Sequence, residues 1–161
     1  RRRSRLGFTM VEALTALSIG MVVLGGGLAL YISVTRNWHA ITFRMGADHD
    51  VNAILNQMVY GVGGNRGLRA AIGELVTTTT NNTGWVLNYK TTYDGPQYSF
   101  TYSAADKTIT FHPGNLVVGR DVAASTISGD RFSVTIAARV ERSLGRLDTQ
   151  RELETTVFYR N

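Results

Sequence analysis

The pattern of hydrophobic and polar positions begins with an apolar segment that contains no charged residue from Ala13 to Thr35, a run of 23 residues. A helix rises about 1.5 Å per residue, so this run would reach about 35 Å, enough to cross a bilayer. The pattern therefore predicts a transmembrane helix. Glu12 directly precedes the run, and an ionised group inside hydrocarbon costs about 2.5 to 3.5 kcal/mol, which marks this carboxylate as a functional candidate.

Helical periodicity continues beyond the apolar run. Apolar residues recur at steps of three or four in two runs separated near Gly46, and Gly61-Val62-Gly63-Gly64 ends the pattern, which predicts one helix from about Phe8 to Tyr60. Gly25-Gly26-Gly27 weaken this helix by about 3 kcal/mol relative to alanine. They also permit close helix packing, so the sequence leaves both interpretations of the glycines open. The periodic residues are Val34, Trp38, Ile41, Met45, Val51, Leu55, Met58 and Val59.

The period changes after Gly64 to stretches rich in β-branched and aromatic residues, which indicates strands. Short turns separate them, so we expect antiparallel neighbours in a sheet of four to six strands, packed on the second half of the helix. The predicted fold class is thus α+β. Thr77 to Thr83, a threonine- and asparagine-rich run, is expected to be a polar loop. The predicted strands are Trp85–Tyr89, Tyr98–Tyr102, Thr108–Phe111, Phe132–Ile136 and Leu153–Tyr159.

Charge is concentrated at the N-terminus. The chain has 161 residues and a net charge of +5, of which Arg1, Arg2, Arg3 and Arg5 supply four. Without residues 1–7 there are 13 basic and 12 acidic residues. A nucleic-acid partner stays open but draws no support from this balance. The chain has no cysteine, which excludes a disulfide framework, a thiolate metal site and a cysteine nucleophile.

The basic cluster also sets an orientation for the apolar segment. By the positive-inside rule the N-terminus stays cytoplasmic, and the chain beyond about Thr35 lies across the membrane. Two simpler interpretations remain. The segment could be a secretory signal, cleaved after Gly27-Leu28-Ala29 to leave Leu30 first, or a plain signal anchor. Neither of them explains Glu12.

The stretch Leu6-Gly7-Phe8-Thr9-Met10-Val11-Glu12 resembles the signal of the type IV pilin superfamily, in which a basic leader ends in Gly, Phe follows, and Glu is the fifth mature residue. The resemblance implies that a prepilin peptidase cuts between Gly7 and Phe8 and methylates the new amine of Phe8. Glu12 would then meet the amine of a neighbouring subunit, since a charge pair in low dielectric is far more favourable than either ion alone.

The resemblance also implies a division of the chain and a role. Residues 1–7 would be the leader, 8–35 the transmembrane and polymerisation half of the long helix, and 36–161 a globular pilin head in which the helix continues to about residue 60. Two further features resemble minor pilins and pseudopilins, the stretch from Gly61 to Ala71 and the Arg160-Asn161 ending.

The expected role is structural: a minor pilin or pseudopilin of a type IV pilus or type II secretion-like filament. It would be made in the bacterial inner membrane with its head in the periplasm, and would then join a pilus or pseudopilus with other pilin subunits. A DNA-uptake or adhesive tip subunit is the alternative, and a signal-anchored periplasmic enzyme is a third class.

Candidate chemistry in the head is sparse, so we expect no enzyme activity, no cofactor and no metal site. Of Asp48, His49, Asp50 and Asn52, only Asp48 and Asn52 share a helix face, which favours a solvated surface over a metal centre. His112 has no recognisable nucleophile as a partner. The arginines that could form a basic rim alternate with acidic residues, which is typical of a solvated surface or of subunit contacts. They are Arg139, Arg142, Arg146 and Arg151.

Overall fold

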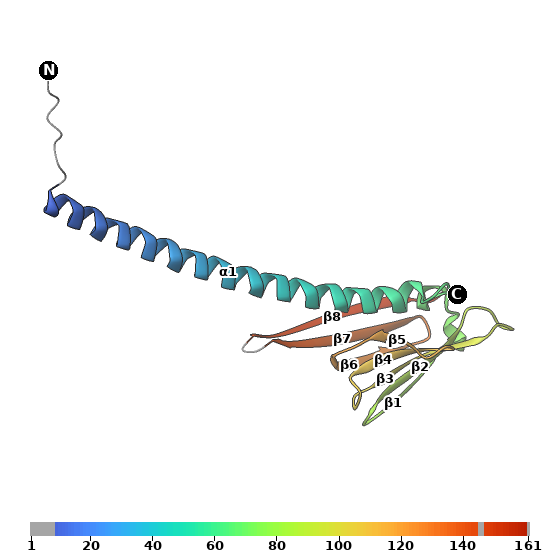
Figure 1. The fold of residues 1–161 in the computed structure, drawn as a ribbon. Helices are drawn as coiled ribbons and strands as arrows, with labels where there is room; N and C mark the ends of the chain where they lie inside the picture. The colour runs from blue at the N-terminus through green and yellow to red at the C-terminus, as the bar shows by residue number, and fades with distance from the viewer. Residues whose placement is uncertain (1–8, 145–146, 161) are drawn as a thin grey trace, which may run out of the picture. The chain divides into compact units, whose positions relative to one another are not determined.

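A computed structural model of the chain describes residues 9–144 and 147–160. The chain divides into two compact units, one ending at Thr42 and the other covering Phe43–Asn161. A long helix, α1 (Met10–Tyr60), supplies the described part of the first unit and the opening of the second (Figure 1). The predicted helix end at Tyr60 is confirmed, while the predicted start at Phe8 lies outside the described residues.

The first unit exposes almost all of its apolar side chains. The most apolar window of α1 is unburied in this chain, and the helix is long and apolar enough to cross a membrane. The helix continues without a break through Gly25, Gly26 and Gly27, where an added Cβ would meet nothing within 4 Å. The apolar surface of α1 within the first unit is therefore not covered by any of the described residues.

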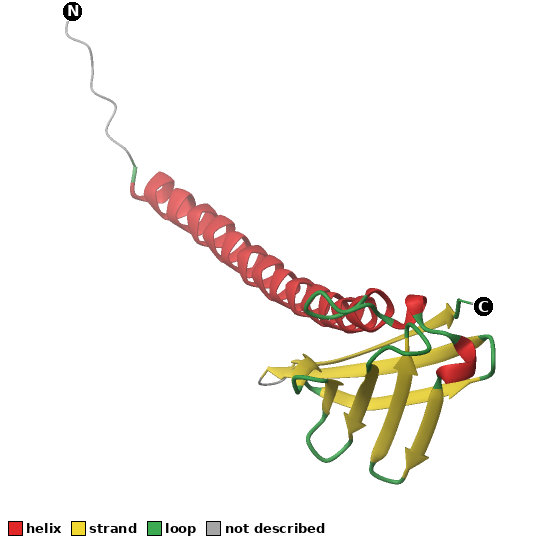
Figure 2. Cartoon of the chain, turned by 90° about the vertical axis from the view of Figure 1, so that its right-hand side faces the viewer, coloured by secondary structure: helices red, strands yellow, loops and turns green. Residues whose placement is uncertain are grey.

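The second unit contains two antiparallel sheets instead of the single sheet of four to six strands that the sequence predicted. The first sheet has the order β1-β2-β3-β4-β5, and the second has the order β6-β7-β8 (Figure 1). Figure 2 shows the strands and the helix in a view turned by 90°. The predicted α+β class, with a long helix packed on antiparallel strands, is confirmed. The strands are β1 (Thr77–Asn81), β2 (Gly84–Lys90), β3 (Gln97–Ser103), β4 (Thr108–His112), β5 (Leu116–Gly119), β6 (Val122–Gly129), β7 (Ser133–Leu144) and β8 (Leu147–Phe158).

The sequence analysis did not predict three of these strands, β1, β5 and β6, and each was missed for a physical reason. The prediction of a loop at Thr77 to Thr83 was wrong, because β1 is an edge strand exposed on both faces and shows no alternation of apolar and polar residues. β5 is only four residues long. β6 fully buries only Val122, so it shows no alternation of buried and exposed positions.

The core lies where the end of α1 meets the two sheets. Buried helix residues recur at steps of three or four, as expected for one helix face, and the buried strand residues alternate, as expected for one sheet face. Aromatic rings on adjacent strands pack in a row, with ring centroids 5.9 Å apart for Tyr89 and Phe100 and 5.2 Å for Phe100 and Phe111. The helix contributes Ala47, Val51, Ile54, Leu55 and Met58.

The earlier apolar stripe of α1 behaves differently. Val34 is 64% exposed, Trp38 68% and Met45 66%, although they follow the same helical spacing as the buried residues. Regular apolar spacing thus predicted the helix correctly, but only its last third contributes to the core of the second unit.

Two short 3₁₀ helices, η1 (Leu68–Ala70) and η2 (Gly73–Leu75), connect α1 to β1. The loop before η1 folds back on the helix end, where the amide of Gly67 donates to the carbonyl of Tyr60 at 3.2 Å. A Cβ at Gly67 would lie 2.4 Å from the carbonyl oxygen of Val59 and 2.4 Å from the amide nitrogen of Gly61. Since both neighbours are backbone atoms, they cannot rotate away.

We expect Gly67→Ala to lower the free energy of unfolding by about 1 to 3 kcal/mol, because the methyl group overpacks a backbone contact. Gly25→Ala is the matched control, since its Cβ enters open space and alanine favours helix. Urea unfolding of the full chain in detergent micelles, followed by tryptophan fluorescence, measures both. Equal stability of the two variants would contradict the steric argument.

Candidate functional site

The candidate site is the first turn of α1, where Glu12 is held by the residue that precedes the helix. Glu12 Oε2 accepts hydrogen bonds from the amide and from the hydroxyl of Thr9, each at 3.0 Å. The hydroxyl oxygen of Thr9 accepts in return from the amide of Glu12 at 3.3 Å. This reciprocal pair is a capping box, which satisfies amides that a helix start otherwise leaves unpaired.

The spacing Thr-x-x-Glu before an apolar run is the sequence signal for a capping box, and sequence reasoning missed it here. The structure therefore gives Glu12 a local partner in addition to the partner in another subunit that the resemblance implies. A carboxylate in the first turn also suits the positive end of the helix dipole. Gly7 and Phe8, the predicted processing residues, lie outside the described residues.

The acidic residues of the α1 segment in the second unit form ion pairs with the β7–β8 hairpin on a face that is still partly solvated. Asp50 pairs with Arg142 of β7, and Asp48 Oδ1 lies 3.0 Å from Nε of Arg151 of β8. Arg142 reaches Asp50 across Gly46, where an added Cβ would lie 2.7 Å from its Nη1. These side chains are about one third to nearly one half exposed, so each pair contributes at most about 1 kcal/mol.

These pairs also bear on the metal question. Within residues 9–144 and 147–160, no three His, Cys, Asp or Glu side chains gather closely enough to hold a metal ion. Asn52 Nδ2 donates to the carbonyl of Asp48 at 2.9 Å, so the amide serves the helix backbone. Two of the arginines predicted to form a mixed surface, Arg142 and Arg151, bind the helix of their own chain.

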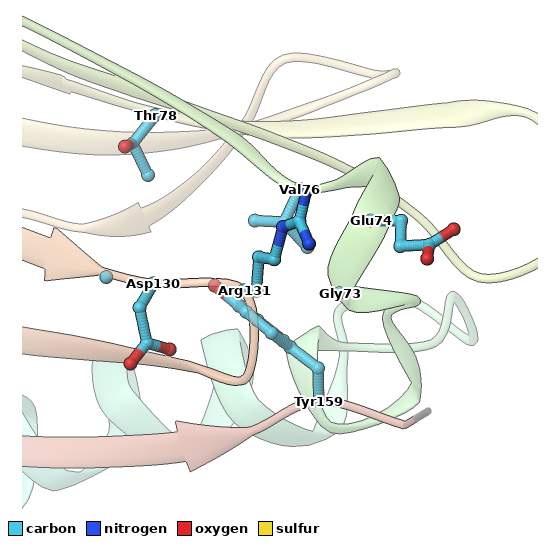
Figure 3. Close-up of a pocket in the computed structure, with 8 residues that line it drawn as sticks. Gly73, Glu74, Val76, Thr78, Asp130, Arg131 and Tyr159 are labelled. Carbon is cyan, nitrogen blue, oxygen red and sulfur yellow. The ribbon is translucent and has the colours of Figure 1, made fainter.

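A hollow of about 370 Å³ lies where the turn between β6 and β7 approaches η2 and β1 (Figure 3). Asp130 accepts hydrogen bonds from the amides of Phe132 and Ser133, both at 2.8 Å, and these bonds hold the pKa of its carboxyl below its usual value. The side chain of Glu74 points away from Asp130 (Figure 3). The two carboxylates are therefore not placed to act as an acid and base pair.

Tyr159 also lines this hollow, and its side chain is largely buried. Burial, and secondarily the negative charge of Asp130, raises the pKa of Tyr159 to about 12. A phenol with a raised pKa is neutral at physiological pH and is a poor general base. The hollow therefore offers packing and hydrogen bonding but no activated group.

Comparison with known families identifies a motif in the N-terminal segment. Residues 2–28 match the prokaryotic N-terminal methylation motif. No curated protein and no solved structure is significantly similar to the chain. The motif supports a type IV pilin-like protein, and the long helix on antiparallel sheets matches the α+β type IV pilin-like fold. The apolar helix fits membrane anchoring of such a protein.

Removal of the cap tests the first-turn geometry. We expect Thr9→Ala to cost about 0.5 to 2 kcal/mol of local helix stability, because the first turn loses its side-chain partners. Hydrogen exchange at the amides of residues 10–13, measured on the full chain in micelles, should accelerate in this variant. Thr15→Ala is the control, since the Thr15 hydroxyl bonds only to carbonyls within the helix. Equal exchange in both variants would argue against the capping box.

Tyr159 predicts a loss of stability at high pH. Its pKa is about 10 in an unfolded chain and about 12 in the folded one, so the neutral form is favoured by folding. This contribution is fully present below pH 10 and is lost as the pH rises toward 12. Tyr159→Phe should reduce the fall in unfolding free energy between pH 10 and 12 by up to about 2 kcal/mol. Tyr93→Phe, at an exposed position, should not change it.

Proposed function

We propose that this chain is a minor pilin or pseudopilin, a structural subunit of a type IV pilus or type II secretion-like filament. The observation that carries the proposal is the methylation motif at residues 2–28. It overlaps the part of α1 that lies in the first unit, where the apolar surface of the helix is exposed. Water cannot be the final environment of that surface, because the hydrophobic effect favours its removal from water. A bilayer before assembly, and neighbouring helices afterwards, both meet this requirement.

Cleavage at the motif creates the charged amine of Phe8, which is the proposed partner for Glu12 of a neighbouring subunit. A prepilin peptidase cuts after Gly7, at the cytoplasmic face of the inner membrane, and methylates the amine of Phe8. The mature N-terminus then carries a positive charge four residues before the carboxylate. In a bundle of such helices, the amine of one subunit pairs with Glu12 of its neighbour, which offsets the cost of placing either charge in low dielectric.

The capping box adds a detail to this scheme. Glu12 has two oxygens, and in the described structure Oε2 accepts both bonds from Thr9. A carboxylate can accept further hydrogen bonds through its other oxygen. Glu12 can therefore cap its own helix and pair with a neighbouring amine at the same time, and the cap would orient the carboxylate before the neighbour arrives.

Two substitutions separate the cap from the charge. Glu12→Gln keeps an acceptor that suits the third position of a capping box but removes the charge. Thr9→Ala removes the cap and keeps the charge. With the precursor expressed beside a prepilin peptidase and the other filament subunits in bacterial membranes, we expect both variants to be cleaved after Gly7, as shown by intact mass.

Assembly should then distinguish the two variants. The Glu12→Gln subunit should fall at least about tenfold in the sheared filament fraction, as expected when an ion is left without its partner in low dielectric. The Thr9→Ala subunit should be incorporated much closer to the wild-type level. Normal incorporation of Glu12→Gln would refute the charge-pair scheme. An uncut precursor in the presence of active peptidase would refute the proposed function itself.

A further inference from the structure

The free edge of β8 opens, near its C-terminal end, into a hollow of about 380 Å³. The hollow lies between the end of α1, the η1 helix and the last residues of β8. Among the residues that the structure describes, its lining contains one cation, Arg69, and no anion, whereas the hollow beside Tyr159 contains Glu74 and Asp130. The lining residues are Val59, Tyr60, Arg69, Thr155, Thr156, Val157 and Phe158.

Backbone geometry shows that this edge is ready to pair with another strand. β8 pairs with β7 on one side only. The amide of Tyr159 donates to Phe132 on the β7 side at 2.8 Å, while the amide of Arg160 donates to the carbonyl of Ala71 on the opposite side at 3.0 Å. Amides alternate sides along a strand, so those of Thr156 and Phe158 also face the free edge. Among the described residues, neither donates to a backbone carbonyl outside the sheet.

The chain itself already occupies this edge just beyond the hollow. Ile72 forms a parallel bridge with Arg160, which places the segment before η2 where a next strand would lie. That pairing ends at residue 160, and the hollow borders residues 155 to 158. The residues before Ala71 form η1, which lies beside β8 and supplies one wall of the hollow, so a second extended segment would enter between η1 and residues 155 to 158.

The side chains around the hollow indicate the chemistry of the occupant. Tyr60 is 63% exposed and Phe158 72% exposed, and both line the hollow. The guanidinium carbon of Arg69 lies 5.8 Å from the centre of the Tyr60 ring, which keeps the cation at this site. Aromatic and arginine side chains are the residues most enriched at the energetic centres of protein interfaces.

We propose that the β8 edge binds an extended segment of a neighbouring filament subunit by strand addition, with an acidic side chain of that segment on Arg69. Main-chain hydrogen bonds to Thr156 and Phe158 would provide affinity, and the hollow would select the side chain. This inference rests on the proposed filament role. It adds a contact between heads to the contact between helices.

Photo-crosslinking in the assembled filament tests the proposal on the full chain. p-Benzoylphenylalanine replaces Phe158, and in a matched strain it replaces Phe132, which is 61% exposed but lies outside the hollow. After irradiation of cells, sheared filaments are analysed by mass spectrometry of crosslinked peptides. We expect position 158 to give an adduct with another filament subunit at an Asp- or Glu-containing peptide, at least about tenfold above position 132.

Two further substitutions identify the forces at the contact. Arg69→Glu should reduce the adduct about tenfold, whereas Arg131→Glu, at an exposed position outside this hollow, should leave it unchanged. Thr156→Pro should reduce the adduct as well, because proline removes an amide on the free edge, where it is tolerated structurally. Resistance of each variant to trypsin checks that the head is folded.

The outcomes separate this inference from the filament role. Normal incorporation with no adduct above the Phe132 position, an adduct insensitive to Arg69→Glu, or an adduct with a protein outside the filament would overturn the strand-addition proposal alone. Absence of the wild-type subunit from the filaments would overturn the proposed function together with the inference that rests on it.

Discussion

The structure depends on one constraint: the N-terminal half of α1 presents an apolar surface that the described part of the chain does not cover. Away from the helix ends every backbone polar group finds an internal partner, so this segment is compatible with hydrocarbon. Its side chains, by contrast, require a non-aqueous surrounding. The need for cover fits membrane anchoring of the single chain, and in the proposed role it makes the segment an assembly surface once neighbours are present.

The same helix changes character along its length because its sequence does. Beyond Thr42, Ala47, Val51 and Met58 are buried against the sheets, while Asp48 and Asp50 reach arginines of the β7–β8 hairpin. Gly46 leaves the space through which Arg142 crosses the helix surface. The helix and hairpin are thus held by an apolar interior and by ion pairs at its margin, and the interior contributes most of the stability because the pairs are partly solvated.

Much of the fold could be predicted from periodicity. The helix to Tyr60 and strands β2, β3 and β4 follow from apolar spacing, because each buries one face. For β7 and β8 the prediction covered only Phe132–Ile136 and Leu153–Tyr159, and it missed the charged and polar residues that extend these strands to Leu144 and back to Leu147. The division into two sheets could not be predicted, since it depends on which strands pair with one another. β1 was missed because an exposed edge strand of threonines carries no apolar pattern. At the site, the motif around Glu12 was recognisable, and the capping role of Thr9 was readable but overlooked.

The loop after α1 has a mechanical consequence. Gly67 donates to Tyr60, and Gly61 donates to Gln57 at 2.9 Å, so the helix end is tied into the loop that leads to the sheets. A force applied along the helix axis would load the helix face and the sheets in shear, across many contacts at once, instead of unravelling the helix from its end one turn at a time. The sheets of the second unit are therefore joined to the helix by contacts that share such a force along the whole length of their overlap.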